Sequence, residues 1–241
     1  MIKYEILNDE EYTQGRLHRI RALKSFADVE AGDIGGWIAS ENNLSQDGDC
    51  WIYNDAKVLG NASITGDAKV KDKVEIFGDS IISGNSQITG KCVIENSKIS
   101  YSIVRDRVYV NNSEIYNSDV SNDATIMSSL LSERVYVFGN ASIYNSTLRN
   151  NCHIFGNADV KECDLRGIIK ISGNADVSNS SIEFVADICD DAVVVNCELN
   201  GSFLIYENAN LNNCKIDIDK KDRMSINTEM NNIMKGVKYE V

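Results

Sequence analysis

Two histidines are the groups in this chain best suited to proton-transfer chemistry, because imidazole titrates near neutral pH. His153 directly precedes the aliphatic Ile154 in a periodic segment, so the two side chains are expected on opposite faces of a strand. That places His153 outward, where it could serve as a general base. The nearby sequence offers no evident carboxylate to orient its ring, so an ordinary surface histidine is the competing interpretation. His18 lies among arginines near the N-terminus, and simple exposure accounts for it.

Aromatic and apolar side chains gather at other outward positions around His153. Phe138 and Phe155 occupy equivalent positions in successive repeats of the sequence and are expected to stack one coil from each other. A cluster of this kind on an otherwise polar surface predicts a contact surface, either for a second copy of the chain or for another protein. The predicted binding residues are Tyr136, Phe138, His153, Phe155, Tyr109, Met127 and Tyr144.

The seven cysteines do not form a metal-binding pattern. Six occupy positions expected to face inward, where a thiol serves as a compact hydrophobic group, and Cys189 is expected to face outward. No spacing of Cys and His residues is typical of a zinc site. We therefore expect no metal and no cofactor. The six inward positions are Cys50, Cys92, Cys152, Cys163, Cys197 and Cys214.

The candidate residues are positioned by a 17-residue repeat that is clearest from Val120 to Ile216. Large aliphatic residues recur there at steps of six, six and five, and an alanine column accompanies them. Towards the N-terminus the steps are six, beginning at Ile52. Self-similarity of this kind indicates stacked coils. The alanine column is Ala124, Ala141, Ala158, Ala175, Ala192 and Ala209.

Steps of five and six do not keep one face on a helix of 3.6 residues per turn, and hairpins would not keep a fixed 17-residue register. The pattern therefore predicts an all-β, single-stranded parallel β-helix with about ten three-sided coils of about 16–18 residues. On each side, one large and one small residue are expected to fill the interior. Corner dipeptides such as Gly139-Asn140 suit left-handed backbone, and stacked Asn side chains are expected to hydrogen-bond along a column.

The ends of the chain depart from the repeat. Residues 1–49 predict a cap that includes two strands, residues 50–218 the β-helix, and residues 219–241 a second cap. In that second cap, Met224, Met230, Ile233 and Met234 suggest a short amphipathic helix ending at Gly236. The glycines of Gly32–Trp37 match no phosphate-binding loop, so tight turns around Trp37 and Trp51 are the expected use.

Composition limits the partners. A formal net charge of −12 argues against direct nucleic-acid binding, which depends on basic residues. The same charge permits an acidic nucleic-acid mimic, although solubilisation of the surface is the simpler interpretation. No apolar run is long enough to span a membrane, and no secretory signal is evident at Met1–Glu5. We expect a cytoplasmic protein with no membrane partner.

The N-terminal third resembles a known family. The stretches Arg19–Leu23, Gly32–Trp37, Asn43–Ser45 and Cys50–Tyr53, followed by Asn-Ala and Asp-Ala hexads, are similar to the YdcK-like proteins of enterobacteria, phages and prophages. That family resembles hexapeptide-repeat proteins with a left-handed β-helix, and its members are often named transferases from their fold. The resemblance therefore implies a left-handed coil. The 17-residue spacing departs from the 18-residue coils usual in the hexapeptide enzymes.

Three functional hypotheses follow. The leading one is a non-enzymatic β-helix scaffold, of phage or prophage origin, that binds a host or viral protein or forms a homo-oligomer. The alternative, implied by the resemblance, is an acyltransferase that uses acyl-coenzyme A, with His153 as general base. The second alternative is a nucleic-acid mimic that blocks a DNA- or RNA-binding protein.

Overall fold

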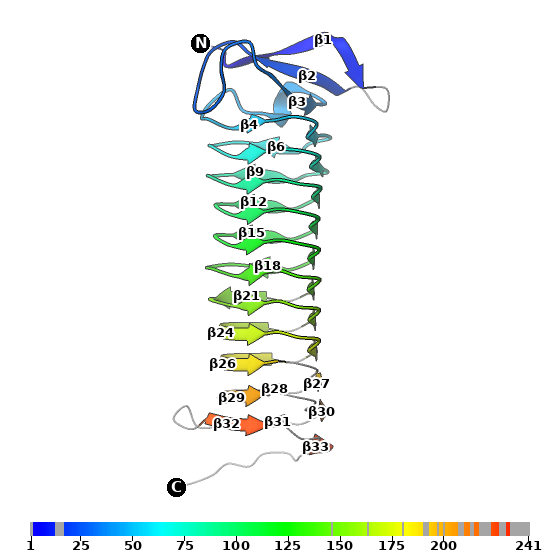
Figure 1. The fold of residues 1–241 in the computed structure, drawn as a ribbon, viewed down its shortest axis with the longest axis vertical. Helices are drawn as coiled ribbons and strands as arrows, with labels where there is room; N and C mark the ends of the chain where they lie inside the picture. Colours follow the sequence, from blue (N-terminus) through cyan, green and yellow to red (C-terminus); the bar gives the residue numbers. More distant parts are fainter. Residues whose placement is uncertain are drawn as a thin grey trace. The chain divides into compact units, whose positions relative to one another are not determined.

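The computed structural model describes residues 2–12, 17–145, 147–162, 164–179, 181–189, 193–196, 198–199, 201–206, 210–212, 215–216, 223–226 and 230–231. The chain divides into two compact units, Met1–Ser121 (unit 1) and Asn122–Val241 (unit 2). Within each unit short strands stack coil upon coil into parallel ladders (Figure 1). The predicted all-β parallel solenoid is confirmed.

Unit 1 begins with an antiparallel cap. Strand β1 (Tyr4–Tyr12) pairs with β2 (Leu17–Ala22), which in turn pairs with β3 (Ile34–Ile38). Strand β3 then runs parallel to β5 (Lys57–Val58) and so joins the cap to the first coil. Because the cap pairs with the first coil through β3, the backbone of β5 does not form an open edge on that side. The predicted N-terminal strand cap is confirmed.

The coils of unit 1 have three sides, which we call first, second and third. Between the cap and the first coil lies a short 3₁₀ helix, η1 (Glu41–Asn43). The first side is built from β4 (Trp51–Ile52), β7 (Lys69–Val70), β10 (Gln87–Ile88), β13 (Ile103–Val104) and β16 (Asp119–Val120). The second side continues from β3 and β5 with β8 (Glu75–Phe77), β11 (Val93–Glu95) and β14 (Tyr109–Asn111). The third side comprises β6 (Ser63–Ile64), β9 (Ile81–Ser83), β12 (Lys98–Ser100) and β15 (Glu114–Tyr116).

Coil length changes within unit 1. Trp51 pairs with Lys69, which closes an 18-residue coil, whereas Lys98 pairs with Glu114, which closes a 16-residue coil. The longer coils turn at glycines with positive φ, such as Gly66 at 67°. In the shorter coils a single left-handed residue such as Asn112, at φ 48°, makes the corner. A tighter corner therefore removes one residue from a side without disturbing the stack.

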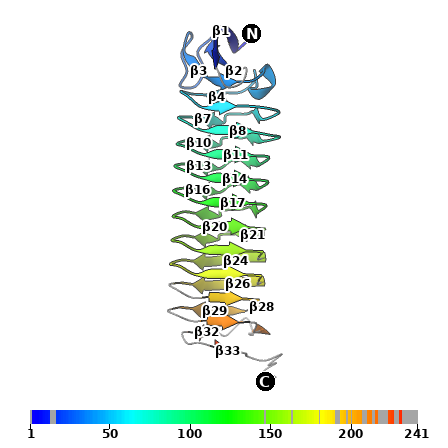
Figure 2. The same ribbon diagram turned by 90° about the vertical axis from the view of Figure 1, so that its right-hand side faces the viewer.

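Unit 2 is likewise built from stacked coils (Figure 2), and we number its three sides in the same way within the unit. Its second side contains β17 (Thr125–Met127), β20 (Ser142–Tyr144), β23 (Asp159–Lys161), β25 (Asp176–Ser178), β27 (Val193–Val195), β30 (Asn210–Asn212) and β33 (Met230–Asn231). Its third side contains β18 (Leu130–Leu131), β21 (Thr147–Asn150), β28 (Glu198–Leu199) and β31 (Lys215–Ile216). Its first side contains β19 (Tyr136–Val137), β22 (His153–Ile154), β29 (Ser202–Ile205) and β32 (Arg223–Ile226). The long strands β24 (Asp164–Ile171) and β26 (Ser181–Ile188) serve both the third and the first side.

The 17-residue register is confirmed in unit 2, where Thr125 pairs with Ser142 and Ser142 with Asp159. The predicted asparagine column is also present. The Nδ2 of Asn140 donates to Oδ1 of Asn157 at 2.9 Å, and the Nδ2 of Asn157 donates to Oδ1 of Asn174 at 2.8 Å. Each amide therefore links two successive coils.

Large and small inward side chains alternate as predicted. In unit 1, Ile64, Ile82 and Ile99 are completely buried, and so are Ala62 and Ser80 beside them. The buried serines hydrogen-bond within the column: the backbone N–H of Ser113 donates to Oγ of Ser97 at 3.0 Å. In unit 2, Ala124, Ala141, Ala158 and Ala175 are completely buried, whereas Ala192 and Ala209 lie outside the described residues.

The prediction of a C-terminal helix is wrong where the structure describes that segment. Met224 lies in β32 and Met230 in β33, because the parallel ladder resumes after the charged connection and pairs Phe203 with Met224 and Leu211 with Met230. Ile233, Met234 and Gly236 lie outside the described residues. No helix in the described part of the chain is long and apolar enough to cross a membrane.

Of the three glycines before Trp37, Gly32 lies in a turn at φ 99° as predicted, whereas the other two have a different role. Gly35 and Gly36 lie inside strand β3, not in a turn. A Cβ atom on Gly36 would lie 2.4 Å from Cγ2 of Ile52 and 2.6 Å from the carbonyl oxygen of Ala56. Glycine is therefore required because the cap lies directly against the first coil.

Candidate functional site

The outward first side of unit 2 brings four of the predicted binding residues together. Its ladder pairs Tyr136 with His153, and their rings lie 4.8 Å apart between centroids. One position beyond each strand, Phe138 and Phe155 stack with centroids 5.0 Å apart and planes 7° from parallel. We call these four residues, Tyr136, Phe138, His153 and Phe155, the aromatic face.

The inward ladder fixes this arrangement. Val137 and Ile154 are completely buried between the outward residues, so their neighbours must point away from the core. The backbone N–H of Tyr136 donates to the carbonyl of Cys152 at 2.8 Å, and that of Phe138 to the carbonyl of Ile154 at 3.0 Å. The spacing of the rings therefore follows from the spacing of the coils.

The aromatic face is accessible to a partner. Tyr136 is 38% exposed and Phe138 39% exposed, and His153 is also exposed. One ring face of Phe138 lies against one ring face of Phe155. The ammonium of Lys170, next to His153 in the ladder, lies 5.5 Å from the centroid of the Phe155 ring. This is an apolar surface with a cation at its border.

His153 has no carboxylate beside it in its ladder. Its neighbours are Tyr136 and Lys170, and Asp187 follows only after Lys170. Two coil steps of about 4.8 Å separate His153 from that carboxylate, which is too far for a hydrogen bond. The described geometry therefore exposes an imidazole without the acid partner that would orient it as a general base.

The remaining predicted binding residues lie elsewhere. Met127 and Tyr144 are ladder partners on the second side of unit 2, where both are partly buried. Tyr109 is partly buried on β14, in unit 1. None of the three belongs to the aromatic face, because each lies on the second side of a coil.

A second exposed aromatic pair, in unit 1, was not predicted. Tyr101 is 60% exposed and Tyr116 47% exposed, and their rings meet edge to face with centroids 5.8 Å apart. Tyr101 makes a corner with φ 51° and stands over Gly84, where a Cβ atom would lie 2.9 Å from its ring. In the sequence, Tyr101 occupies the corner position one coil after Gly84, and this spacing could have predicted an exposed ring there.

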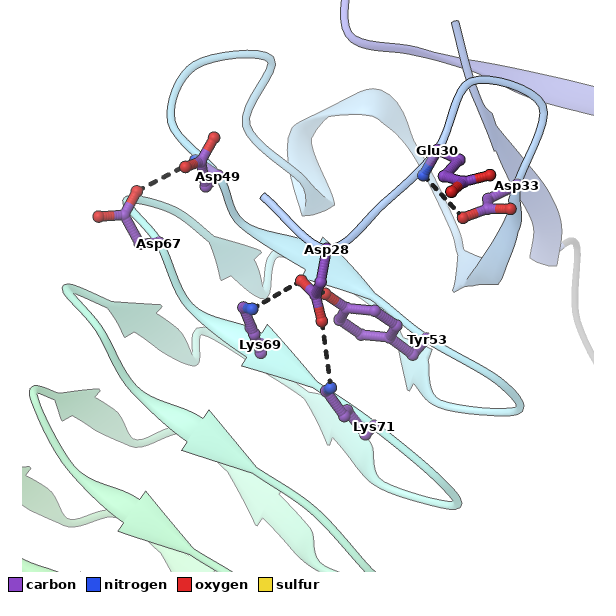
Figure 3. A network of polar contacts seen from close by, with 8 residues as sticks. All are labelled: Asp28, Glu30, Asp33, Asp49, Tyr53, Asp67, Lys69 and Lys71. Carbon is purple, nitrogen blue, oxygen red and sulfur yellow. Dashed lines mark hydrogen bonds and ion pairs between the residues drawn. The ribbon is translucent and has the colours of Figure 1, made fainter. Parts of the chain in front are cut away.

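A polar cluster holds the cap of unit 1 to its first coils (Figure 3). Asp28 comes from the turn between Phe26 and Val29. Its Oδ1 accepts hydrogen bonds from the Tyr53 hydroxyl at 2.7 Å and from Nζ of Lys69 at 2.6 Å, and its Oδ2 lies 3.6 Å from Nζ of Lys71. We call this set, Asp28, Tyr53, Lys69 and Lys71, the Asp28 cluster.

The Asp28 cluster changes the titration of its members. The hydrogen bond from Lys69, followed by that from Tyr53, holds the pKa of the Asp28 carboxyl well below its usual range. Burial, followed by the hydrogen bond to Asp28, raises the pKa of the Tyr53 hydroxyl. The turn itself contains Ala27 at φ 43°, a left-handed conformation that is unfavourable for alanine. The contacts of its neighbours hold the turn in place.

A buried lysine also fastens the cap. Lys3 is 1% exposed, and its Nζ donates to the carbonyls of Cys50 at 3.0 Å and Gly48 at 3.2 Å. The Cys50 thiol lies 3.3 Å from the same Nζ, and burial raises the pKa of that thiol. Carbonyl oxygens replace the water that a buried ammonium loses. Lys3 therefore secures the start of the chain to the first coil.

The cysteines that the structure describes do not suggest a metal site. Cys92 and Cys152 are buried as predicted, and burial raises the pKa of Cys92 to about 11. Cys189 is partly buried, with Sγ 3.5 Å from the carbonyl oxygen of Ile205. Cys163, Cys197 and Cys214 lie outside the described residues. Within the described residues, no three His, Cys, Asp or Glu side chains gather as metal ligands would.

Comparison with known proteins supports the resemblance seen in the sequence. Part of the chain is similar to YdcK. The "Uncharacterized acetyltransferase YdcK" of Escherichia coli is 45% identical over 56 residues. The match spans 20% of this chain and 17% of that protein, well under two thirds of either. No family model matches the chain.

A crystal structure from Desulfovibrio desulfuricans, which carries the provisional name of an acetyltransferase, also matches. It shares 10% sequence identity and covers 74% of this chain and 66% of its own, with a TM-score of 0.27. That score is too low to support an argument about function.

Proposed function

We propose that the chain is a β-solenoid binding protein whose aromatic face contacts a protein surface. The observation that carries the proposal is the pair of stacked rings on the first side of unit 2, with Tyr136 and Phe138 more than a third exposed. Buried aromatic anchors supply much of the free energy of protein contacts. The parallel ladder beneath them holds the rings in fixed positions, so little conformational entropy is lost on binding.

The test removes the two stacked rings. Replacing Phe138 and Phe155 with Ser should leave the monomer folded, because neither side chain belongs to the inward ladder. Each anchor contributes about 2 kcal/mol, so the double variant should weaken association by roughly a thousandfold. Analytical ultracentrifugation and affinity capture measure the loss.

The exposed pair in unit 1 gives a matched control. The double variant Tyr101→Ser, Tyr116→Ser removes an exposed aromatic pair that lies outside the aromatic face, and both tyrosines are more exposed than Phe138. It should keep every association of the parent chain. The proposal fails if the Phe138 and Phe155 variant keeps them as well.

A second candidate is an acyltransferase, favoured by the similarity to a protein named an acetyltransferase. In that case His153 would accept the proton of an acceptor hydroxyl or amine as that group attacks the thioester carbonyl of acyl-coenzyme A, and coenzyme A would leave as the thiol on receiving that proton. The ladder around it holds Tyr136 and Lys170, with no adjacent acid. Titration with acetyl-coenzyme A in a calorimeter tests this candidate, and His153→Ala should abolish any transfer activity.

The nucleic-acid mimic is less well supported. Several acids of unit 1 are neutralised by neighbouring cations, as in the pairs Lys57–Glu75 at 2.9 Å and Lys98–Glu114 at 2.8 Å. A mimic needs a continuous row of unpaired acids to replace phosphates.

A further inference from the structure

A corner beside the aromatic face carries an exposed aliphatic side chain on unfavourable backbone. Ile168 is 61% exposed, and its φ is 48°. Left-handed backbone is unfavourable for a β-branched residue, whereas Asn151, one coil earlier at φ 59°, is of a type that tolerates it. The isoleucine therefore neither suits the local backbone nor fills the core. Backbone strain that the fold does not need is typical of a functional surface.

Ile168 extends the aromatic face. The ladder places it one coil after Asn151 and two coils after Arg134. Arg134 lies two residues before Tyr136, with buried Val135 between them, so both side chains point outward. Two residues of an extended strand span about 7 Å, so one partner surface reaches this corner column and the rings together.

The same corner is cationic. Arg134 and Arg149 are both exposed. Among the described residues, neither guanidinium forms an ion pair or a hydrogen bond with another side chain. Residues 132–138 and 149–155 contain these two arginines and one acid, Glu133. Unpaired guanidinium groups beside apolar rings fit a partner surface that presents carboxylates and aliphatic side chains.

The cap of unit 1 carries a surface of that kind. Arg21 pairs with Ile34 and lies two residues before Leu23, so Leu23 and Ile34 share the outward face of the cap, where they are 46% and 51% exposed. The turn before Ile34 adds the exposed acids Glu30 and Asp33, and Oδ2 of Asp33 accepts the backbone N–H of Glu30 at 2.8 Å (Figure 3). We call Leu23, Glu30, Asp33 and Ile34 the cap patch.

We infer that the aromatic face of one copy, extended by Ile168 and Arg134, binds the cap patch of a second copy of this chain. The inference rests on the proposed function and adds the identity of the partner. Charge supports the choice, because residues 23–49 contain six acids and one lysine, opposite in sign to Arg134 and Arg149. Each copy has a formal net charge of −12, but physiological salt screens charges beyond about 8 Å, so the local pairs prevail.

The contact joins two different surfaces and is therefore heterologous. Each copy offers its aromatic face to one neighbour and its cap patch to another. A two-fold contact centred on the aromatic face would instead bring the arginines of both copies together, which is unfavourable. Assembly therefore continues beyond a dimer as the concentration rises, unless the copies close into a ring.

Mixing two variants tests this pairing. Phe138→Ser, Phe155→Ser breaks the aromatic face and keeps the cap patch, whereas Leu23→Ser, Ile34→Ser does the reverse. The first should self-associate roughly a thousandfold and the second about a hundredfold more weakly than the parent. Mixed together, they should form a one-to-one complex as tight as the parent contact, because one intact surface of each kind remains. Sedimentation velocity gives the sizes and dissociation constants.

Three results overturn the inference: a parent chain that is monomeric at high micromolar concentration, a mixture that stays monomeric, and a cap variant that self-associates like the parent. If the cap variant does so while the Phe138 and Phe155 variant loses its associations, the contact surface of the proposed function stands and the cap patch loses its role. Circular dichroism and the melting temperature check the fold of each variant. Leu23→Ser alone replaces the double change if that variant does not fold.

The role of Ile168 has its own test. Ile168→Asn relieves the backbone and should raise the melting temperature by about 2 °C, yet weaken association by about tenfold. Tyr101→Asn is the matched control, because Tyr101 is also exposed at a left-handed corner but lies in unit 1, outside both surfaces. It should leave association unchanged. An Ile168→Asn variant that associates like the parent removes Ile168 from the contact.

Discussion

On unit 1, Lys57 pairs with Glu75 and Lys98 with Glu114 on the following coil, whereas on unit 2 Phe138 stacks on Phe155. The inward columns of both units are filled in the same way, by one large and one small residue on each side. The difference shows that the inward residues determine the coil and leave the outward positions free to vary. These charged outward pairs of unit 1 are satisfied within the chain, whereas the stacked rings of unit 2 leave apolar area exposed.

The largest expected effect comes from the positions that the units share. Ala68 in unit 1 and Ala158 in unit 2 are both completely buried, so Ala68→Asp and Ala158→Asp each place a charge in a dry column. Each should cost about 4 kcal/mol or more of unfolding free energy. Urea denaturation of the two variants checks this.

The control for Ala158 is its outward neighbour. Asn157→Asp removes the amide donor of one hydrogen bond to Asn174 and should cost only about 1 kcal/mol. Equal losses for Ala158→Asp and Asn157→Asp would mean that the alternation of inward and outward residues is wrong.

A smaller effect is expected at the Asp28 cluster, which has no counterpart in the described part of unit 2. Asp28→Asn keeps the shape of the side chain but removes its charge. Because the Asp28 side chain is 46% exposed, solvent screening limits the loss to about 1 kcal/mol. Thermal denaturation measures this loss of stability. Asp79→Asn is the control, because among the described side chains only that of Asn61 donates a hydrogen bond to Asp79.

The pH dependence of that loss has a definite sign. The pKa of Asp28 is lower in the folded protein than in the unfolded chain, where it is about 4. The charged carboxylate therefore stabilises the fold fully above about pH 4, and this stabilisation is lost as the pH falls from there towards the folded pKa. The parent and Asp28→Asn should therefore differ at pH 7 and converge in strong acid. A difference that persists at pH 1 or grows on acidification would contradict the assigned cause.

The smallest effect is expected at His153. Its ring is exposed and contacts Tyr136 at the edge of the aromatic face, so His153→Ala should change the unfolding free energy by no more than about 0.5 kcal/mol. It should change association only a few-fold. A loss as large as that of the Phe138 and Phe155 variant would move the centre of the contact to His153.

The period of the sequence was sufficient to predict the coils. Positions that face the core accept only apolar or small side chains, so these residue types recur once for each side of a coil. The period also placed Phe138 beside Phe155, since ladder neighbours follow from the 17-residue spacing. The C-terminal helix was predicted wrongly because Met230, Ile233 and Met234 follow a helical i, i+3, i+4 spacing, whereas Met224 and Met230 pair with Phe203 and Leu211 of the preceding coil. The Asp28 cluster was missed because Asp28 lies 41 residues from Lys69 and outside the repeat that connects the coil residues.

The difference between the two aromatic pairs can be measured on the unaltered protein. Hydroxyl-radical footprinting at low and high protein concentration reports the solvent exposure of individual rings. We predict that Tyr136, Phe138 and Phe155 become protected as the concentration rises, while Tyr101 and Tyr116 are labelled equally at both. Unchanged labelling of the three rings of the aromatic face, or equal protection of Tyr101 and Tyr116, would contradict a contact surface specific to the first side of unit 2.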